Sequence, residues 1–140
     1  MKHQGIPRVM SKFFIPLIML FALYVQFHGD FGPGGGFQAG VIFAAAVVLY
    51  ALIFGLKAAK QVVSPTVIEI LVSLGVLIFA GTGMASVFLG GEFLNYNVFD
   101  AHDPAHGQHM GILLIELGVG ITVAAVMICI FFSFAGRGRK

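Results

Sequence analysis

Apolar residues in this chain are gathered into four long stretches that short polar segments separate. The stretches run from about Val9 to Phe27, Gly36 to Leu56, Thr66 to Leu89 and Met110 to Phe134. About 20 helical residues, each rising 1.5 Å, cross the roughly 30 Å hydrocarbon layer of a membrane. The pattern therefore predicts an all-α integral membrane protein in which residues 1–140 form a single membrane domain of four transmembrane helices.

The first stretch is the weakest of the four. Polar or helix-breaking residues interrupt it, namely Ser11, Lys12, Pro16 and Gln26. A cleaved signal peptide would open in the same way, with basic residues before a short apolar segment. No small-residue cleavage site follows Val25. We therefore favour a helix that is retained.

Composition narrows the class of protein. Apolar residues make up 59% of the chain, and the mean hydropathy is +0.98. Eight basic and six acidic side chains are too few to cover a soluble domain of this length, which argues against a soluble enzyme. The net charge of +2 does not indicate a nucleic-acid partner, because the basic residues form three small groups separated by apolar stretches.

The few charges are sorted by side in a four-span arrangement. All eight basic residues fall on one side, and they are Lys2, Arg8, Lys12, Lys57, Lys60, Arg137, Arg139 and Lys140. Four acidic residues fall on the other, and they are Asp30, Glu92, Asp100 and Asp103. Because basic loops stay on the cytoplasmic side, this distribution predicts that both termini are cytoplasmic.

Two acidic residues remain within or near the hydrocarbon. Glu69 lies one turn into the third span, where a helix end tolerates a carboxylate. Glu116 lies about six residues, or roughly 9 Å, inside the fourth span. A carboxylate at the centre of a span costs about 2.5–3.5 kcal/mol, so we expect Glu116 to face protein or water. Two interpretations stay open: ion or proton handling, and an interhelical hydrogen bond from a protonated acid.

The segment between the first two stretches is rich in glycine. It follows His28 and Asp30 and reads Gly32-Pro33-Gly34-Gly35-Gly36-Phe37-Gln38-Ala39-Gly40. A dinucleotide-binding fingerprint is disfavoured, because that motif needs a preceding strand and here the flanks are membrane spans. We favour a tight hairpin at the outer surface that packs the start of the second helix against a neighbour. The other interpretation is a loop that enters the membrane and lines an ion path.

A second polar segment carries three histidines, His102, His106 and His109. On one helix they would share a face, as metal ligands sometimes do. Pro104 and Gly107 argue against a continuous helix there. We therefore favour a polar loop that covers the outer face over a metal or proton-collecting site.

Local signals mark helix ends and packing faces. Ser64-Pro65 and Asp103-Pro104 offer caps followed by a first-turn proline, and Thr66 and Glu69 have the spacing of a capping box. The single cysteine, Cys129, is expected to be a small buried residue. Small residues that favour close helix contacts recur every four positions, and they are Gly36, Gly40, Ala44, Gly81, Ala85, Gly120 and Ala124.

Two of these motifs resemble a known family. The run Pro33-Gly34-Gly35-Gly36-Phe37 followed by Gly40, and the run Ile115-Glu116-Leu117-Gly118-Val119, resemble the B subunit (MnhB/MrpB family) of Mrp-type multisubunit Na⁺/H⁺ antiporters. The resemblance covers the chain from about Leu17 to Phe132. Family members often carry histidine where this chain has Asp30, and aspartate where it has Glu116.

The resemblance implies a transporter subunit rather than an enzyme. It implies a chain without a cofactor or metal, in the bacterial cytoplasmic (inner) membrane, that works with antiporter subunits A, C, D, E, F and G to exchange Na⁺ for H⁺. Such a subunit is needed for assembly and exchange and does not pump alone. Candidate ion-path residues are Glu116, Glu69, Asp30 and His28. The alternative is a membrane subunit of a hydrogenase-like or complex-I-like respiratory oxidoreductase.

Overall fold

Every regular element that the structure describes is helical. The computed structural model describes residues 5–29, 32–100 and 102–137. Its elements are α1 (Gly5–His28), α2 (Gly36–Phe54), α3 (Leu56–Val62), α4 (Pro65–Phe88), the 3₁₀-helix η1 (Tyr96–Phe99) and α5 (Pro104–Gly136). Helices α1, α2, α4 and α5 are long and apolar enough to cross a membrane, which confirms the prediction of four such helices.

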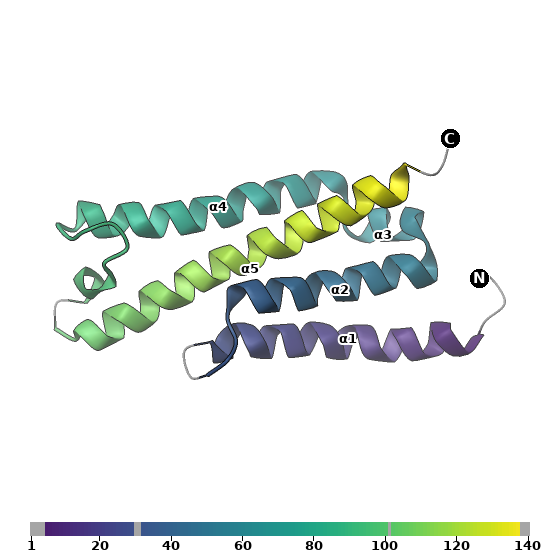
Figure 1. Cartoon of the computed structure of the whole chain (residues 1–140), viewed down its shortest axis with the longest axis horizontal. Coiled ribbons are helices and arrows are strands. Elements are labelled where there is room, and N and C mark those ends of the chain that lie inside the picture. Colours follow the sequence, from purple (N-terminus) through teal and green to yellow (C-terminus); the bar gives the residue numbers. More distant parts are fainter. Residues whose placement is uncertain (1–4, 30–31, 101, 138–140) are drawn as a thin grey trace.

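Helix α5 is the central element of the bundle. It packs against α4 on one side and α2 on the other, and α1 packs mainly on α2 (Figure 1). The first turn of α1 and the last turn of α5 lie at the same end of the bundle (Figure 1). At the opposite end, α4 and the first turns of α5 extend beyond the connection between α1 and α2 (Figure 1).

The start of α5 differs from the sequence-based expectation. The helix begins at Pro104, six residues before Met110, so the doubt about a helix through Pro104 and Gly107 was wrong. Pro104 occupies the first turn, where its missing N–H costs nothing. Gly107 is buried, and a Cβ there would lie 2.8 Å from the carbonyl oxygen of Tyr96. Its small size therefore lets η1 approach the helix.

The start of α4 follows the capping prediction in part. Ser64 is the N-cap, and its Oγ accepts a hydrogen bond from the N–H of Val67 at 3.3 Å. Pro65 is the first helical residue, as expected. Thr66 already lies within the helix, so the predicted capping box between Thr66 and Glu69 is not the cap that forms. The short helix α3, which precedes Ser64, was not predicted.

Small residues make the closest helix contacts. A Cβ at Gly40 of α2 would lie 2.7 Å from the carbonyl oxygen of Gly120 in α5. A Cβ at Gly75 of α4 would lie 2.7 Å from the carbonyl oxygen of Gly118 in α5. The predicted packing faces of the second and fourth spans are thus confirmed. Gly81 has no heavy atom within 4 Å of its Cβ position and lies outside these contacts.

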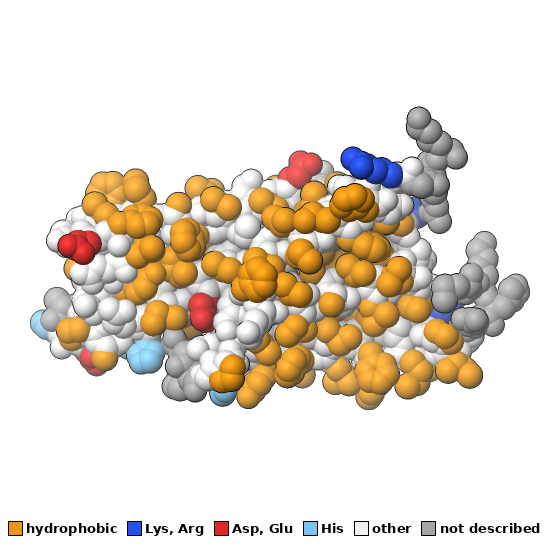
Figure 2. Space-filling model, viewed as in Figure 1, with side chains coloured by type: hydrophobic (Ala, Val, Ile, Leu, Met, Phe, Trp, Pro, Cys, Tyr) orange, Lys and Arg blue, Asp and Glu red, His pale blue; other side chains and the backbone are white. Residues whose placement is uncertain are grey.

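The sides of the bundle are strongly apolar. In Figure 2, hydrophobic side chains cover its length, while lysine and arginine side chains lie at the end that holds the start of α1 and the end of α5. Cys129 is exposed, so the expectation of a buried cysteine was wrong for this chain by itself. A chain with so much apolar surface fits lipid or the helices of other subunits. The buried core is correspondingly small, and its members are Ala44, Val47, Ala51, Ala59, Ile68, Ala125, Ile128 and Phe132.

Candidate functional site

The carboxylate of Glu116 lies against the glycine-rich connection between α1 and α2. A Cβ at Gly29 would lie 2.6 Å from each of the two carboxylate oxygens, and a Cβ at Gly35 would lie 2.8 Å from Oε1. The Cβ position of Gly36 meets the backbone carbonyl oxygen of Glu116. The side chain is half-buried. Gly29 and Gly35 therefore make the room in which this carboxylate sits, and Gly36 lets the start of α2 approach the backbone of α5.

The backbone of the connection is held onto the end of α1. Gly35 adopts φ 112° and ψ 177°, a conformation that is essentially restricted to glycine. Its N–H donates a hydrogen bond to the carbonyl oxygen of Val25 at 3.2 Å. A Cβ at Gly34 would lie 2.9 Å from the same oxygen. The close approach of two backbones thus explains why glycines stand here.

The remaining residues of the glycine-rich motif differ in burial. Gly40 is buried against α5, whereas Pro33 is exposed and Phe37 is 65% exposed. The start of the second helix was predicted to pack on a neighbour. That neighbour is α5 of the same chain.

The glycine connection lies beside the middle part of α5 (Figure 1). Glu116 stands twelve residues after Pro104, which is about 18 Å along the helix axis. The α4–α5 connection therefore lies at the end of the bundle, beyond the connection between α1 and α2 (Figure 1). The Glu116 carboxyl is thus placed along the side of α5, against the connection between α1 and α2.

Two of the other predicted ion-path residues, His28 and Glu69, are among the described residues. The ring of His28 is half-buried and stacks on Tyr24, with 5.1 Å between the ring centroids. Glu69 is exposed near the start of α4, whereas α4 meets α5 near Glu116 through Gly75. Asp30 lies outside the described residues.

Gln26, which was expected only to interrupt the first span, belongs to the same region. Its side chain is 8% exposed, and its Oε1 contacts the Cβ position of Gly120. The sequence signal for a buried position was a single amide side chain within an apolar stretch. A polar side chain in a span is rarely tolerated unless it faces protein.

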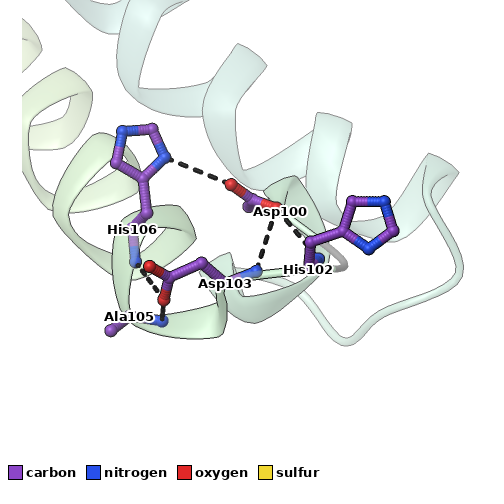
Figure 3. A network of polar contacts seen from close by, with 5 residues as sticks. All are labelled: Asp100, His102, Asp103, Ala105 and His106. Carbon is purple, nitrogen blue, oxygen red and sulfur yellow. Dashed lines mark hydrogen bonds and ion pairs between the residues drawn. The ribbon is translucent and has the colours of Figure 1, made fainter.

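The histidine segment forms the capped start of α5 (Figure 3). Oδ1 of Asp103 accepts hydrogen bonds from the N–H groups of Ala105 at 3.1 Å and His106 at 3.3 Å. Oδ1 of Asp100 accepts from the N–H groups of His102 at 2.9 Å and Asp103 at 3.1 Å. The backbone N–H of Asp103, followed by that of His102, lowers the pKa of the Asp100 carboxyl below its ordinary value.

The imidazole groups do not assemble a metal site. Nδ1 of His106 lies 3.3 Å from Oδ2 of Asp100 (Figure 3). His106 and His109 are part of α5, so the favoured interpretation of the segment as a loop was wrong for both. Within the described ranges, no group of three or more His, Cys, Asp or Glu side chains is placed to hold a metal ion. The geometry is that of a helix cap.

Four long apolar helices and an apolar outer surface define a multi-pass membrane protein, in which the Glu116 carboxylate is half-buried against the connection between α1 and α2. Residues 6–129 match the family described as "Domain related to MnhB subunit of Na+/H+ antiporter". The chain belongs to this family, which confirms the resemblance drawn from the glycine and Glu116 motifs.

Curated relatives match over nearly the whole chain. The protein named antiporter subunit mnhB2 from Staphylococcus haemolyticus (strain JCSC1435) is 34% identical over 137 residues, covering 96% of each chain. The protein of the same name from Staphylococcus aureus (strain Newman) is 32% identical over 141 residues, covering 99% of each chain. These comparisons favour a transporter subunit over the oxidoreductase alternative.

Proposed function

We propose that this chain is an integral subunit of a multisubunit Na⁺/H⁺ antiporter and takes part in ion exchange only together with other subunits. The family match over residues 6–129 and the relatives named as antiporter subunits carry this proposal. The expected partners are antiporter subunits A, C, D, E, F and G, the membrane lipid, and the ions Na⁺ and H⁺.

Glu116 is the group that we assign to the border of the ion path. A carboxylate can bind a proton or pair with a cation, and both ions of the exchange can therefore compete for it. The surrounding glycines leave its oxygens close to the backbone of the α1–α2 connection. Glu69 is a weaker candidate, because it is exposed near the start of α4. His28 and Asp30 flank Gly29 in the sequence and stay proposed ion-path residues.

One half-buried carboxylate does not make a complete path. Exchange across a membrane needs a series of groups that change charge state, and the lysine and arginine side chains visible in Figure 2 lie at one end of the bundle. The remaining groups of the path must then come from other subunits. This distribution supports a role in assembly and exchange rather than in pumping alone.

The basic end of the bundle also supports an orientation. Lysine and arginine side chains gather at the end that holds the start of α1 and the end of α5 (Figure 2). By the positive-inside rule, this end faces the cytoplasm of a bacterium and the chain lies in the cytoplasmic membrane. A reporter that fluoresces only in the cytoplasm, fused after Lys140, would fluoresce in this orientation.

The function is tested by removing the chain from a cell that produces the whole complex. Everted membrane vesicles are energised, and Na⁺-dependent proton movement is followed with a pH-sensitive dye. We expect deletion of the gene to abolish the Na⁺-dependent signal and a plasmid copy to restore it. Unchanged exchange in the deletion strain would overturn the proposal.

A further inference from the structure

Lysine and arginine side chains gather at one end of the bundle, where α1 begins and α5 ends (Figure 2). Those that the structure describes are Arg8 and Lys12 in α1, Lys57 and Lys60 in α3, and Arg137 at the C-cap of α5. Within the described ranges, none of these side chains forms an ion pair with a carboxylate. Cations without a counter-charge raise the local positive potential and attract anions. The basic end therefore needs an anion from outside the described part of this chain.

Two of these cations belong to one corner of the bundle. The guanidinium carbon of Arg8 lies 5.4 Å from the centre of the Phe54 ring, and an arginine over a ring face keeps N–H donors for an anion. Phe54 ends α2, and Lys57 follows in the first turn of α3. Arg8 and Lys57 are both exposed, and Gly55 between the two helices has no heavy atom within 4 Å of its Cβ position. The basic corner, defined as Arg8, Phe54 and Lys57, is therefore open from outside.

The other two cations near this end lie against α5. Nζ of Lys60 is 5.7 Å from the centre of the Phe132 ring and 4.0 Å from the Cβ position of Gly136. Lys60 is half-buried there, beside the last turn of α5, whose carbonyl groups carry partial negative charge. The guanidinium carbon of Arg137 lies 5.6 Å from the centre of the Phe134 ring. This pair carries the same charge as Arg8 and Lys57 and gives a matched control.

The surface beside Arg8 needs hydrocarbon as well as an anion. Helix α1 exposes three apolar side chains near Arg8, namely Ile6, Val9 and Phe13. Acyl chains cover such side chains in a membrane, whereas phosphate oxygens accept hydrogen bonds from arginine and lysine. A phospholipid with a negatively charged headgroup supplies both in one molecule. A carboxylate from a protein partner would supply the charge alone.

We propose that the basic corner binds an anionic phospholipid, with its phosphate beside Arg8 and Lys57 and its acyl chains along the exposed apolar side chains of α1. Clusters of lysine and arginine at the ends of membrane spans recognise anionic lipids by the same electrostatics. This inference goes beyond ion exchange. Headgroup phosphates line both faces of a membrane, so it does not depend on the orientation of the chain.

Photoactivatable lipids test the corner in the intact complex. The complex is purified in mild detergent through a tag on this chain and mixed with phosphatidylglycerol or phosphatidylcholine, each carrying the same photoreactive acyl chain. We expect phosphatidylglycerol to label this chain at least threefold more than phosphatidylcholine, on peptides from the start of α1 or the end of α2. Equal labelling by the two lipids, or labelling confined to other peptides, would overturn the proposal.

Paired substitutions separate the corner from a general effect of charge. We expect Arg8→Gln with Lys57→Gln to abolish the preference for phosphatidylglycerol, at an unchanged amount of the chain in the membrane. Lys60→Gln with Arg137→Gln removes the same charge at the same end and should keep the preference. Equal loss in both double variants would show diffuse attraction and contradict a site at the corner.

A carbodiimide tests whether a protein carboxylate occupies the corner instead, because it joins a carboxylate directly to a lysine amine. We expect no crosslink between Lys57 and another subunit. A crosslinked product that maps to Lys57 and is absent in Lys57→Arg would assign the corner to a protein partner and overturn the proposal. Lipid labelling and crosslinking are scored without ion exchange, so this inference and the proposed function can fail separately.

Discussion

The backbone of Gly35 faces the carboxylate of Glu116, and a Cβ at Gly35 would lie 2.8 Å from Oε1. This contact joins the α1–α2 connection to the side of α5. Gly29 approaches the same carboxylate from the other end of the connection. The two glycines therefore fix how much space the carboxylate has, and a proton or cation that reaches it must fit in that space.

Alanine at Gly29 tests the contact by itself. Its backbone is not in the left-handed region, and a Cβ would lie 2.6 Å from both oxygens of Glu116. We expect Gly29→Ala to displace the carboxylate and to lower Na⁺-dependent proton exchange at least fivefold, at an unchanged yield of complex. The measurement is dye-monitored exchange in vesicles, normalised to the amount of the chain.

Gly35→Ala adds backbone strain to the same contact, and Gly55→Ala is its matched control. Gly55 has a similar conformation, with φ 99° and ψ 152°, and no heavy atom within 4 Å of its Cβ position. Each change costs about 1–3 kcal/mol of stability, because these conformations are essentially restricted to glycine. We expect exchange per complex to fall in Gly35→Ala alone. Equal loss in both variants would assign the effect to strain rather than to Glu116.

Neutralising Glu116 tests the assigned ion-path role. We expect Glu116→Gln to reduce exchange at least tenfold in an assembled complex, because a glutamine can neither release a proton nor pair with Na⁺ as a carboxylate does. Glu116→Asp keeps the charge and should retain part of the activity. Glu92→Gln serves as the control, since Glu92 is an exposed acid outside the candidate ion-path residues. Full exchange in Glu116→Gln would leave this acid a purely structural group.

The helices could be predicted because their signals are local. A long apolar run is sufficient to identify a span, and Ser64 and Asp103 with their following prolines mark helix starts by the chemistry of the cap. The start of α5 was placed too late because Gly107 was taken as a helix breaker. Gly107 instead makes room for the backbone of Tyr96, and the spacing of residues along the chain does not reveal this contact.

The candidate site could be predicted only in part. Glu116 was identified as a carboxylate within a span, and the glycine motif was identified as a constrained backbone. Their contact depends on how α2 packs on α5, which no local pattern specifies. The environment of Gln26 depends equally on α5, through Gly120. Long-range packing therefore decides which polar residues meet.

The carboxyl of Asp100 makes a pH-dependent contribution to the α4–α5 connection. Its pKa is lowered from the ordinary value of 3.8, chiefly because the N–H of Asp103 and then that of His102 bind the ionised form. The stabilisation is therefore complete above the ordinary value and is lost as the pH falls through the lowered one. We expect the protection of the His102 and Asp103 amides from hydrogen exchange, measured relative to the intrinsic rate at each pH, to fall over that acidic range.

Two variants separate this effect from general acid unfolding. Asp100→Asn should show fast exchange at these amides at neutral pH and lose most of the acid-induced change. Glu92→Gln, at an exposed acid of the same connection, should behave as the parent. A parent-like profile in Asp100→Asn would exclude the ionised carboxyl as the cause.

Valine at Gly118 tests the contact between α4 and α5. A Cβ at Gly118 would lie 2.9 Å from the carbonyl oxygen of Gly75 and 3.1 Å from the backbone nitrogen of Phe79. These atoms belong to a helix backbone, so they cannot turn aside as a flexible side chain can, and the two helices must separate. Overpacking of this kind costs about 1–3 kcal/mol. We expect Gly118→Val to lower the melting temperature of the detergent-purified chain, whereas Gly81→Val, where nothing lies within 4 Å, should change it much less. A drop of equal size in both variants would attribute the loss to the helix propensity of valine and not to the contact with Gly75.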